Sequence, residues 1–354
     1  MVRTSSVGVI SRPYFETLLI PSNRRHPKFL MTTARFSELH DISELARAVG
    51  VPAEQIRSYA GASDQALSYT RLKIPKRGRK RRGQFRVVYK ANQEWLSQFH
   101  RMVAIIVVKS APFDDHVQGF VQGRSIRTNA QFHLGARFVL HADISNFFDS
   151  ITTTQARQSL ISIGAREEIA QVVARACTID GYLRQGTRCS PALANIVCSH
   201  LDLDLIRLAR VHGSRYTRYA DDLTFSGEDT PTSESVAAVL NQHGFKLRDG
   251  RCYTQRRGRG QFVTGLHVGN NDQPRLPRRL KRRLRLVLHY VEKFGIEAHF
   301  KREAGNDFEL EGMLRFAHSI EPVLANKLLA QLATGRTRES QMDDPDYMHD
   351  APEY

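Results

Sequence analysis

The sequence predicts an α+β protein in which an antiparallel sheet, backed by helices, lies between two mainly helical regions. Two observations predict this class. Between Phe138 and Val268, short segments with the alternation of strands are interleaved with segments of helical period. Before and after this core, apolar residues recur at helical spacing, with Gly and Pro at the breaks. At 354 residues, the chain is long enough for two to three domains.

The N-terminal part is predicted to be an arm followed by helices. Residues 1–33 carry little periodicity. From Phe36 to Tyr59, apolar residues recur at helical spacing around Gly50-Val51-Pro52, which predicts two short helices. This pair also resembles a helix-turn-helix, although packed helix pairs with a glycine turn are common without any role in reading DNA. A further helix is predicted from Trp95 to Lys109, ended by Pro112.

A strongly basic segment precedes that helix. Nine Lys or Arg residues lie between Arg71 and Arg86, with Gly78 and Gly83 among them, and a strand-like FRVVY follows. This pattern predicts a basic hairpin. A solvated loop is the alternative, but so many like charges repel each other unless phosphates lie nearby. We therefore favour contact with phosphates.

The core contains the predicted strands. Phe138, Leu140 and Ala142 alternate with Val139, His141 and Asp143, which predicts a half-buried strand with Asp143 at its end. The segment from Tyr216 to Phe225 predicts two short strands joined at Ala220-Asp221. The remaining core segments predict helices at Pro191–Arg210 and Ser233–His243 and a strand at Gln261–Val268.

After Pro274 the chain becomes basic and helical. Seven Lys or Arg residues occur in the eleven positions from Arg275 to Arg285, while Leu280, Leu284 and Leu288 recur at helical spacing. Such a helix can lie on a membrane surface or beside a nucleic-acid backbone. The helical pattern continues to about Ala333, and the acidic segment that follows is expected to be disordered.

Charge and composition restrict the class of partner. The net charge is +16, although residues 339–354 hold six acidic residues and no Lys or Arg. A polyanion would screen this charge, so nucleic acid is the expected partner. No apolar run reaches the ~20 residues of a membrane span and no signal peptide is evident, so a cytoplasmic protein is expected. The four cysteines lack C-x-x-C spacing, so neither zinc nor disulfides are expected.

The strongest chemical signal is Tyr219-Ala220-Asp221-Asp222, which places two adjacent carboxylates at the tip of a predicted hairpin. Asp143 supplies a third carboxylate if its strand lies beside that hairpin. Three carboxylates without a His or Cys cluster suit Mg²⁺, and two such ions at ~3.5–4 Å would support phosphoryl transfer. A solvated Asp-Asp turn is the alternative for this motif taken alone.

These residues resemble a family. The Asp143-bearing strand, the turn Gln185-Gly186 followed by Ser190-Pro191 and Asn195, and Tyr219-Ala220-Asp221-Asp222 together resemble reverse transcriptases in order and spacing. Asn129-Ala130-Gln131-Phe132-His133 and Val263-Thr264-Gly265 resemble elements of bacterial retron reverse transcriptases. Arg184 and Arg188 stand where relatives often have proline, which is a departure from the family.

The resemblance implies a right-hand polymerase. The expected parts are an N-terminal arm (1–33), fingers (34–135), a palm (136–270) with a fingers insertion near 150–184, a helical thumb (271–335) and an acidic disordered tail (336–354).

The resemblance also assigns roles to residues. Asp143, Asp221 and Asp222 would be catalytic and would bind two Mg²⁺ ions, with the backbone oxygen of Ile144 as a further ligand. The expected dNTP-binding residues are Lys76, Arg86, Phe148, Gln185, Gly186 and Lys246. The expected nucleic-acid contacts are Asn129, His133, Val263, Thr264, Gly265, Arg278, Arg279, Lys281, Arg282, Arg283 and Arg285.

Two of these residues have ordinary alternatives. Phe148 matches the bulky residue that crowds a ribose 2′-hydroxyl, but it is equally consistent with a core aromatic. Lys246 matches a lysine near the triphosphate, but a single Lys after a helix is usually only solvated.

The function implied is RNA-directed DNA synthesis of the retron type. Such enzymes copy a structured noncoding RNA, prime from a guanosine 2′-hydroxyl and make a branched RNA–DNA molecule that acts with an effector protein in anti-phage defence. The alternatives are another bacterial reverse transcriptase, of the group II intron or other defence type, and a noncatalytic RNA-binding protein on the same fold. A membrane-surface protein is a more distant alternative.

Overall fold

The computed structural model describes residues 34–76, 83–269, 272–294 and 307–339. Three of the predictions above fall outside these residues: the arm (1–33), most of the basic run (77–82) and the tail from residue 340.

The N-terminal region confirms the two predicted short helices. After the 3₁₀ turn η1 (Phe36–Glu38) come α1 (Ile42–Val49) and α2 (Ala53–Gly61). The Asp41 side chain caps α1 by accepting a hydrogen bond from the backbone N–H of Glu44. Gly50 ends α1 in the left-handed conformation, with φ 69°, where a residue without a side chain is preferred. The turn η2 (Gln65–Ser68) leads to the hairpin.

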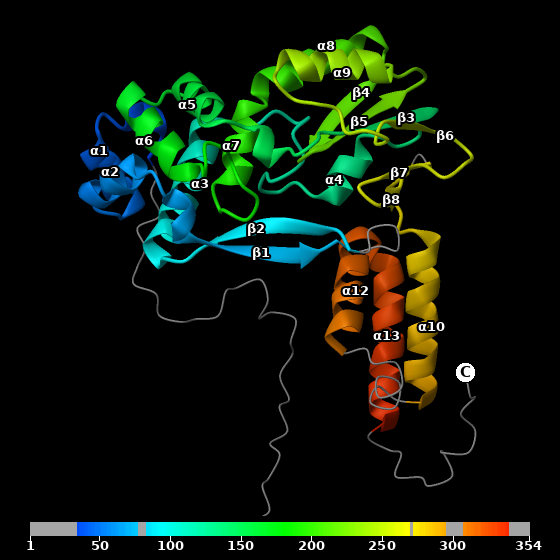
Figure 1. The fold of residues 1–354 in the computed structure, drawn as a ribbon. Coiled ribbons are helices and arrows are strands. Elements are labelled where there is room, and N and C mark those ends of the chain that lie inside the picture. Colours follow the sequence, from blue (N-terminus) through cyan, green and yellow to red (C-terminus); the bar gives the residue numbers. More distant parts are fainter. Residues whose placement is uncertain (1–33, 77–82, 270–271, 295–306, 340–354) are drawn as a thin grey trace, which may run out of the picture.

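The basic segment forms the predicted hairpin. Strands β1 (Tyr69–Pro75) and β2 (Phe85–Ala91) pair antiparallel, from Tyr69 opposite Ala91 to Pro75 opposite Phe85. The hairpin extends away from the helices that precede it (Figure 1). Helix α3 (Glu94–Ser110) follows and matches the prediction from Trp95 to Lys109.

The central sheet has the strand order β4-β5-β3-β6, and every neighbouring pair is antiparallel. Its strands are β3 (Phe138–Asp143), β4 (Arg215–Tyr219), β5 (Asp222–Gly227) and β6 (Tyr253–Arg256). Helices α8 (Ser199–Val211) and α9 (Ser233–Gln242) cover one face of the sheet (Figure 1). Strand β6 was not predicted, because its sequence is short, polar and largely exposed, and therefore carries no hydrophobic period.

Strand β3 is more buried than its alternating pattern predicts. Leu140 and Ala142 pack into the large core shared with the N-terminal helices. Val139 is also fully buried, because it packs on the opposite face against a second core that contains Val263 and Leu266. Strand β3 therefore lies between two cores.

Two predicted elements are divided in the structure. The helix expected at Pro191–Arg210 is two helices, α7 (Ser190–Val197) and α8, which meet at Cys198, where ψ is 0°. The bend lets α7 pack on α3 while α8 packs on β4. The strand expected at Gln261–Val268 is a hairpin of β7 (Phe262–Val263) and β8 (Leu266–His267), because Thr264 and Gly265 both have positive φ.

Shorter elements connect these parts. They are α4 (Ile126–Gln131), η4 (Phe148–Ser150), α5 (Thr153–Ser162) and α6 (Glu167–Cys177). Helices α5 and α6 pack together beside α2, so the expected insertion near 150–184 lies with the N-terminal helices rather than on the central sheet (Figure 1).

The C-terminal bundle consists of α10 (Arg278–Phe294), α12 (Asp307–Ile320) and α13 (Pro322–Glu339), and it projects away from the central sheet (Figure 1). Its interior contains Leu284, Leu288 and Leu314. Helix α13 runs to Glu339 and so includes residues 336–339, which were expected in the disordered tail. No proline follows Pro322 before Pro345, so nothing in the chain forces an earlier end.

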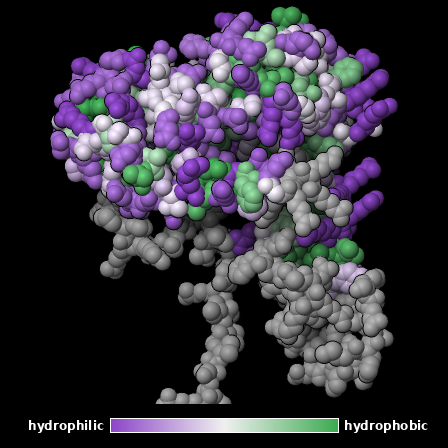
Figure 2. Space-filling view, viewed as in Figure 1, coloured by the Kyte–Doolittle hydropathy of each residue, from purple (hydrophilic) through white to green (hydrophobic). Residues whose placement is uncertain are grey.

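The surface of the described chain is mainly hydrophilic, in agreement with a composition that is 25% charged. Hydrophilic residues dominate the visible face of the described chain (Figure 2). Among the described residues, the structure contains no helix with the length and apolar character needed to cross a bilayer.

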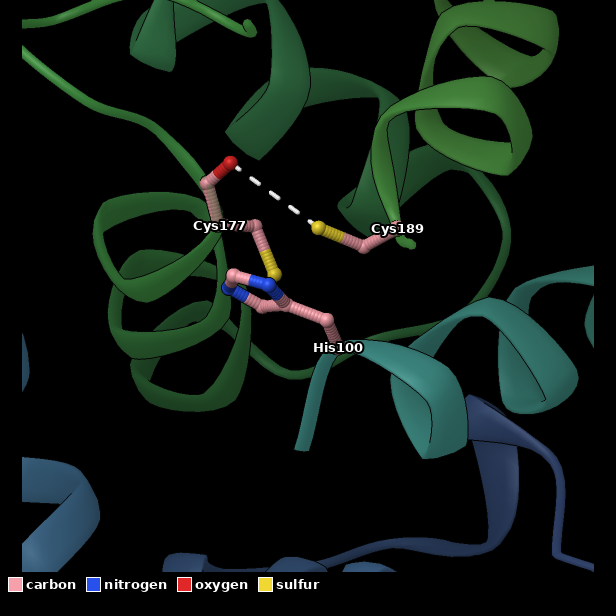
Figure 3. Close-up of side chains that lie close together, drawn as sticks. All are labelled: His100, Cys177 and Cys189. Atoms are coloured by element: carbon pink, nitrogen blue, oxygen red, sulfur yellow. Dashed lines mark hydrogen bonds between the residues drawn. The ribbon is translucent and has the colours of Figure 1, made fainter. Parts of the chain in front are cut away.

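The N-terminal core contains a polar cluster that cysteine spacing did not reveal. His100, Cys177 and Cys189 come from α3, the end of α6 and the start of α7, and their ligand atoms lie within 4.8 Å of one another (Figure 3). Burial lowers the pKa of His100 to about 4 and raises the pKa of Cys177, so both groups are neutral. Three donors are one fewer than a structural zinc site uses, and His100 Nε2 already lies 3.1 Å from the Ala176 carbonyl oxygen. We interpret the cluster as core packing.

Candidate active site

The structure confirms that the strand of Asp143 lies beside the acidic turn, which we define as residues 219–222. Asp143 at the end of β3 is directly opposite Asp222 at the start of β5. Such opposed residues have Cβ atoms ~5 Å apart. The backbone N–H of Ile144 donates to the carbonyl oxygen of Asp221 at 2.9 Å, which attaches the end of β3 to the turn. The three predicted acids therefore converge.

The acids are close enough to raise one another's pKa. The pKa of Asp222 is raised to about 7, mainly by burial and further by the charges of Asp221 and Asp143. Burial also raises the pKa of Asp221 and Asp143, and the charge of Asp143 adds to the effect on Asp221. Carboxylates that repel each other are stabilised by cations, and an all-oxygen donor set suits a hard divalent ion. The residues present therefore fit a divalent metal.

Arg248 is the functional candidate that sequence reasoning missed. Its guanidinium Nη1 lies 3.3 Å from Asp143 Oδ1, and its backbone N–H donates to the Asp143 carbonyl oxygen at 2.8 Å. Its charge lowers the pKa of all three acids and so partly offsets their repulsion. In the sequence, the one feature that could have indicated a role for Arg248 is its position two residues after Lys246. Lys246 itself has an exposed side chain, and its carbonyl oxygen accepts from Ser145 N–H at 2.8 Å.

A cavity of 480 Å³ adjoins the acids. Asp143, Asp222 and Tyr219 line it from the central sheet, and Thr264 and Gly265 line it from the β7–β8 hairpin. Thr264 and Gly265, which were predicted to contact nucleic acid, thus line the same cavity as the acids. Val263, which was also predicted to contact nucleic acid, is fully buried. Arg251 adds a basic side chain to this lining.

The burial of Asn129 and His133 is inconsistent with the predicted nucleic-acid contact. Both side chains are in the interior, at 1% and 0% exposure. The His133 ring nitrogens lie 2.7 Å from the hydroxyls of Ser226 and Thr217, and Thr217 Oγ1 donates to Asn129 Oδ1 at 2.7 Å. Burial lowers the pKa of His133 to about 3, so the ring is neutral. These residues attach α4 to β4 and β5, because their polar atoms are used within the fold.

Several of the predicted nucleotide-binding residues lie in the β1–β2 hairpin or in the turn at residues 185–186, which packs on β2 before α7 begins. Arg86 is exposed on β2, and Phe148 is half-buried in η4. The backbone N–H of Tyr89 donates to the Gln185 carbonyl oxygen at 2.8 Å. A Cβ at Gly186 would lie 2.4 Å from Val88 Cγ1, so the missing side chain at this position allows the turn to pack on β2. Lys76, at the end of β1, is near enough to Asp143 that its charge lowers the pKa of that carboxyl.

The basic residues of α10 divide into two groups. Arg278, Arg279, Arg282, Arg283 and Arg285 are exposed. Lys281 differs, because its Nζ lies 2.7 Å from Glu321 Oε1 and its side chain is largely covered. Lys281 therefore joins α10 to the start of α13, which is a role within the fold that the sequence did not indicate.

A buried ion pair supports the acidic turn from behind. The Arg218 guanidinium binds both carboxylate oxygens of Asp202 at 2.8 and 2.6 Å, and both residues are buried. Its Nη1 also donates to Asn195 Oδ1 at 3.0 Å and to the Ala220 carbonyl oxygen at 3.4 Å. Ala220 has φ 59°, which is unfavourable for a residue with a side chain. The ion pair therefore holds a strained turn in place.

Gly119 supports the same turn from its other side. The Asn195 side-chain amide donates to the Gly119 carbonyl oxygen at 3.0 Å. A Cβ on Gly119 would lie 2.4 Å from the backbone nitrogen of Ala220. Only glycine therefore fits between this segment and the turn.

The comparisons with known proteins agree with this geometry. The profile of a family described as "Reverse transcriptase (RNA-dependent DNA polymerase)" matches residues 74–252. Retron Mx65 reverse transcriptase from Myxococcus xanthus is 34% identical over 310 residues, which cover 80% of this chain and 69% of that protein. Retron Mx162 reverse transcriptase, from the same organism, is 32% identical and covers 84% and 67%. Retron Ec86 reverse transcriptase from Escherichia coli is 27% identical and covers 84% and 89%.

An acidic turn on a four-stranded antiparallel sheet, flanked by a basic hairpin and a helical bundle, defines a right-hand polymerase with palm, fingers and thumb. The chain belongs to the reverse transcriptase family, in its bacterial retron-type group. It is thus an RNA-directed DNA polymerase, which is a nucleotidyltransferase that uses an RNA template and depends on divalent metal.

We expect Gly119→Ala to impair synthesis strongly without unfolding the protein. The new Cβ would displace the Ala220 backbone, and a displacement of about 1 Å at reacting groups costs about 100-fold in rate. Primer extension measures this loss, and thermal unfolding measures stability. Gly61→Ala is the matched control, since its Cβ would have nothing within 4 Å. Full activity in Gly119→Ala would contradict the proposed support of the turn.

We expect the three acids to make metal-free protein less stable as the pH rises. Because the pKa of Asp222 is raised, the folded state favours its protonated form, and this stabilisation is lost between pH ~4 and about 7. Asp222→Asn should therefore raise the melting temperature of metal-free protein at pH 8, with little change at pH 4.5.

The same reasoning gives the effect of metal. Mg²⁺ should raise the melting temperature of the unmodified protein more at pH 8 than at pH 5.5, and the gain should be smaller in Asp222→Asn. Differential scanning calorimetry in EDTA and in Mg²⁺ measures both effects. Equal Mg²⁺ effects at the two pH values would argue against the acids as the metal site.

Proposed function

We propose that this protein reverse transcribes a cognate structured noncoding RNA, priming from a 2′-hydroxyl of that RNA to give a branched RNA–DNA molecule. The product would act with an effector protein in anti-phage defence in the cytoplasm. The observation that carries the polymerase assignment is the convergence of Asp143, Asp221 and Asp222 at one end of the sheet. The retron assignment is supported by the similarity to retron reverse transcriptases over about four-fifths of the chain.

We propose that Asp143, Asp221 and Asp222 hold two Mg²⁺ ions, with the Ile144 carbonyl oxygen as an additional ligand. Within the described residues, no backbone N–H donates to that oxygen, which leaves it available. When bound, such ions activate an attacking hydroxyl and stabilise the leaving oxygen of a phosphoryl transfer. The role of the chain is to keep three mutually repelling carboxylates together, and Arg248 limits their repulsion when the site holds no metal.

The incoming dNTP would lie between the fingers hairpin and the acids. Lys76 and Arg86 would neutralise its triphosphate, Lys246 would add charge nearby, and Phe148 would exclude a ribose 2′-hydroxyl. Gln185 would offer its side-chain amide to the nucleotide, and Gly186 would keep the turn against β2. The primer hydroxyl gives up its proton to water, and its oxygen forms a bond to the α-phosphorus. The bond between that phosphorus and the oxygen bridging to the β-phosphorus breaks, and pyrophosphate leaves. The influence of Lys76 on Asp143 supports this placement.

The RNA–DNA duplex would lie along the cavity side of the β7–β8 hairpin and the exposed bases of α10. Thr264 and Gly265 border the cavity beside the acids. The five exposed arginines of α10 supply positive charge next to it along the chain. Duplexes of A-form are held mainly through backbone and shape, which such charges suit.

The test is to sequence nucleic acid that copurifies with the protein. The chain expressed with its neighbouring noncoding RNA gene should retain one RNA covalently joined to DNA. Asp221→Asn should retain the RNA without DNA, because the fold and RNA surface are kept while a metal ligand is lost. Asp64→Asn, an exposed aspartate in the fingers, is the control and should behave as the unmodified protein. DNA joined to RNA in equal amounts in Asp221→Asn would overturn the catalytic assignment, and unjoined DNA copies of varied RNAs would overturn the retron assignment.

We expect Arg282→Ala with Arg285→Ala to reduce the salt dependence of RNA binding. If both side chains contact phosphates, the slope of log affinity against log salt should fall by about 1.4 to 1.8, since each contact contributes ~0.7–0.9. Affinity measured from 50 to 300 mM salt gives this slope. Arg47→Ala, an exposed arginine on α1, is the control. An unchanged slope in the double variant would remove these residues from the RNA-binding surface.

A further inference from the structure

Backbone strain singles out one residue that the proposed mechanism does not use. Among the described residues, the non-glycine positions with positive φ are Phe120, Asn146, Asp180, Ala220 and Thr264. Asn and Asp tolerate this conformation. Ala220 is in the acidic turn, and Thr264 lines the adjoining cavity. Phe120, with φ 62°, is a bulky aromatic in a conformation that glycine would adopt at no cost.

Phe120 lies beside the acidic turn. Gly119, its neighbour, is the residue whose Cβ position would be 2.4 Å from the Ala220 nitrogen and 3.0 Å from the Tyr219 carbonyl carbon. The Gly119 N–H donates to the Arg218 carbonyl oxygen at 3.3 Å, and the Gly119 carbonyl oxygen accepts from Asn195 at 3.0 Å. The network that supports the turn thus also fixes the point from which the Phe120 side chain extends.

The ring of Phe120 contacts the ring of Phe148. Their centroids are 6.1 Å apart, and the rings are inclined at 47°. Phe148 also contacts the ring of Phe147, which is buried, with the ring centroids 5.2 Å apart. Among the ring contacts of the described residues, Phe148 thus has a buried neighbour, Phe147, and an exposed outer neighbour, Phe120. Phe120 remains 46% exposed, so core packing does not explain why an aromatic stands at this strained position.

We propose that Phe120 is a positioning residue for nucleotide selection, which acts by holding the Phe148 ring where it excludes a ribose 2′-hydroxyl. The inference rests on the proposed contact between Phe148 and the sugar of the incoming nucleotide. Without Phe120, the Phe148 ring loses its outer neighbour and gains room to turn away from the sugar. Selection against ribonucleotides then weakens, while the acids and their support remain in place.

The experiment compares single-nucleotide incorporation of a dNTP and the matching rNTP on an RNA template. Phe120→Ala should reduce the ratio of kcat/KM for the dNTP to kcat/KM for the rNTP by about two- to tenfold. This is the change in rate that corresponds to the loss of one aromatic pair. Most of the change should be improved use of the rNTP. Phe120→Gly should show the same loss with an equal or higher melting temperature, because glycine relieves the strained backbone. Phe120→Tyr, which keeps the ring, should keep the ratio.

A double-mutant cycle tests whether Phe120 acts through Phe148. Phe148→Val should reduce the ratio more than Phe120→Ala, and the double variant should be no worse than Phe148→Val alone. Phe316→Ala, which truncates a comparably exposed aromatic on thumb helix α12, is the control and should leave the ratio unchanged.

The outcomes separate this inference from the proposed function. An unchanged ratio in Phe120→Ala and Phe120→Gly, with a reduced ratio in Phe148→Val, overturns the role of Phe120 and leaves the proposed function standing. Weaker template binding in Phe120→Ala without any change in the ratio also overturns it, and identifies Phe120 as a stacking surface for nucleic acid. An unchanged ratio in Phe148→Val overturns the role of both residues. If the effects of the two substitutions on the ratio add fully in the double variant, Phe120 does not act through Phe148.

Discussion

The structure depends on one unfavourable interaction, which is the forced proximity of three carboxylates, those of Asp143, Asp221 and Asp222. Burial and mutual repulsion raise the pKa of Asp143, Asp221 and Asp222, so the chain alone does not stabilise the charged forms of these acids. Arg248 offsets only part of this cost through a single contact of 3.3 Å to Asp143. Bound cations would therefore stabilise the charged form of the site, which is consistent with a metal-dependent polymerase.

The surrounding fold resists the tendency of these acids to move apart. Strand pairing sets Asp143 opposite Asp222, and the ion pair of Arg218 with Asp202 holds Ala220 in its left-handed conformation. A buried ion pair contributes little net stability compared with apolar packing. Removing one partner, however, leaves an unpaired buried charge and destabilises the fold by ~3–5 kcal/mol. The arrangement makes alternative positions of the turn expensive. The buried side chains of Arg218 and Asp202 therefore keep the acidic turn rigid from behind.

Sequence reasoning found the acids because strand alternation and a turn motif place them without knowledge of distant contacts. It could not find Arg248 or the Arg218–Asp202 pair, because an isolated basic or acidic residue looks the same whether it faces solvent or a buried partner. For Asn129, His133 and Lys281, the polar residue type suggested a nucleic-acid contact, whereas the structure shows side chains that are buried or paired within the fold. The hairpin at Thr264 was missed because a positive φ at threonine leaves no pattern in the sequence.

Strand β3 connects the C-terminal helical bundle with the three acids through packing. Leu140 and Ala142 pack in the core of the fingers and palm, whereas Val139 packs in the core that the thumb shares with the β7–β8 hairpin. The cavity is likewise lined by Ala142 from the first core and by Ile126, which packs against the second. A shift of the thumb core against the palm would therefore act both on the strand that ends at Asp143 and on the lining of the cavity. If the exposed arginines of α10 bind nucleic acid, as proposed, this packing would link that binding to the geometry of the acids.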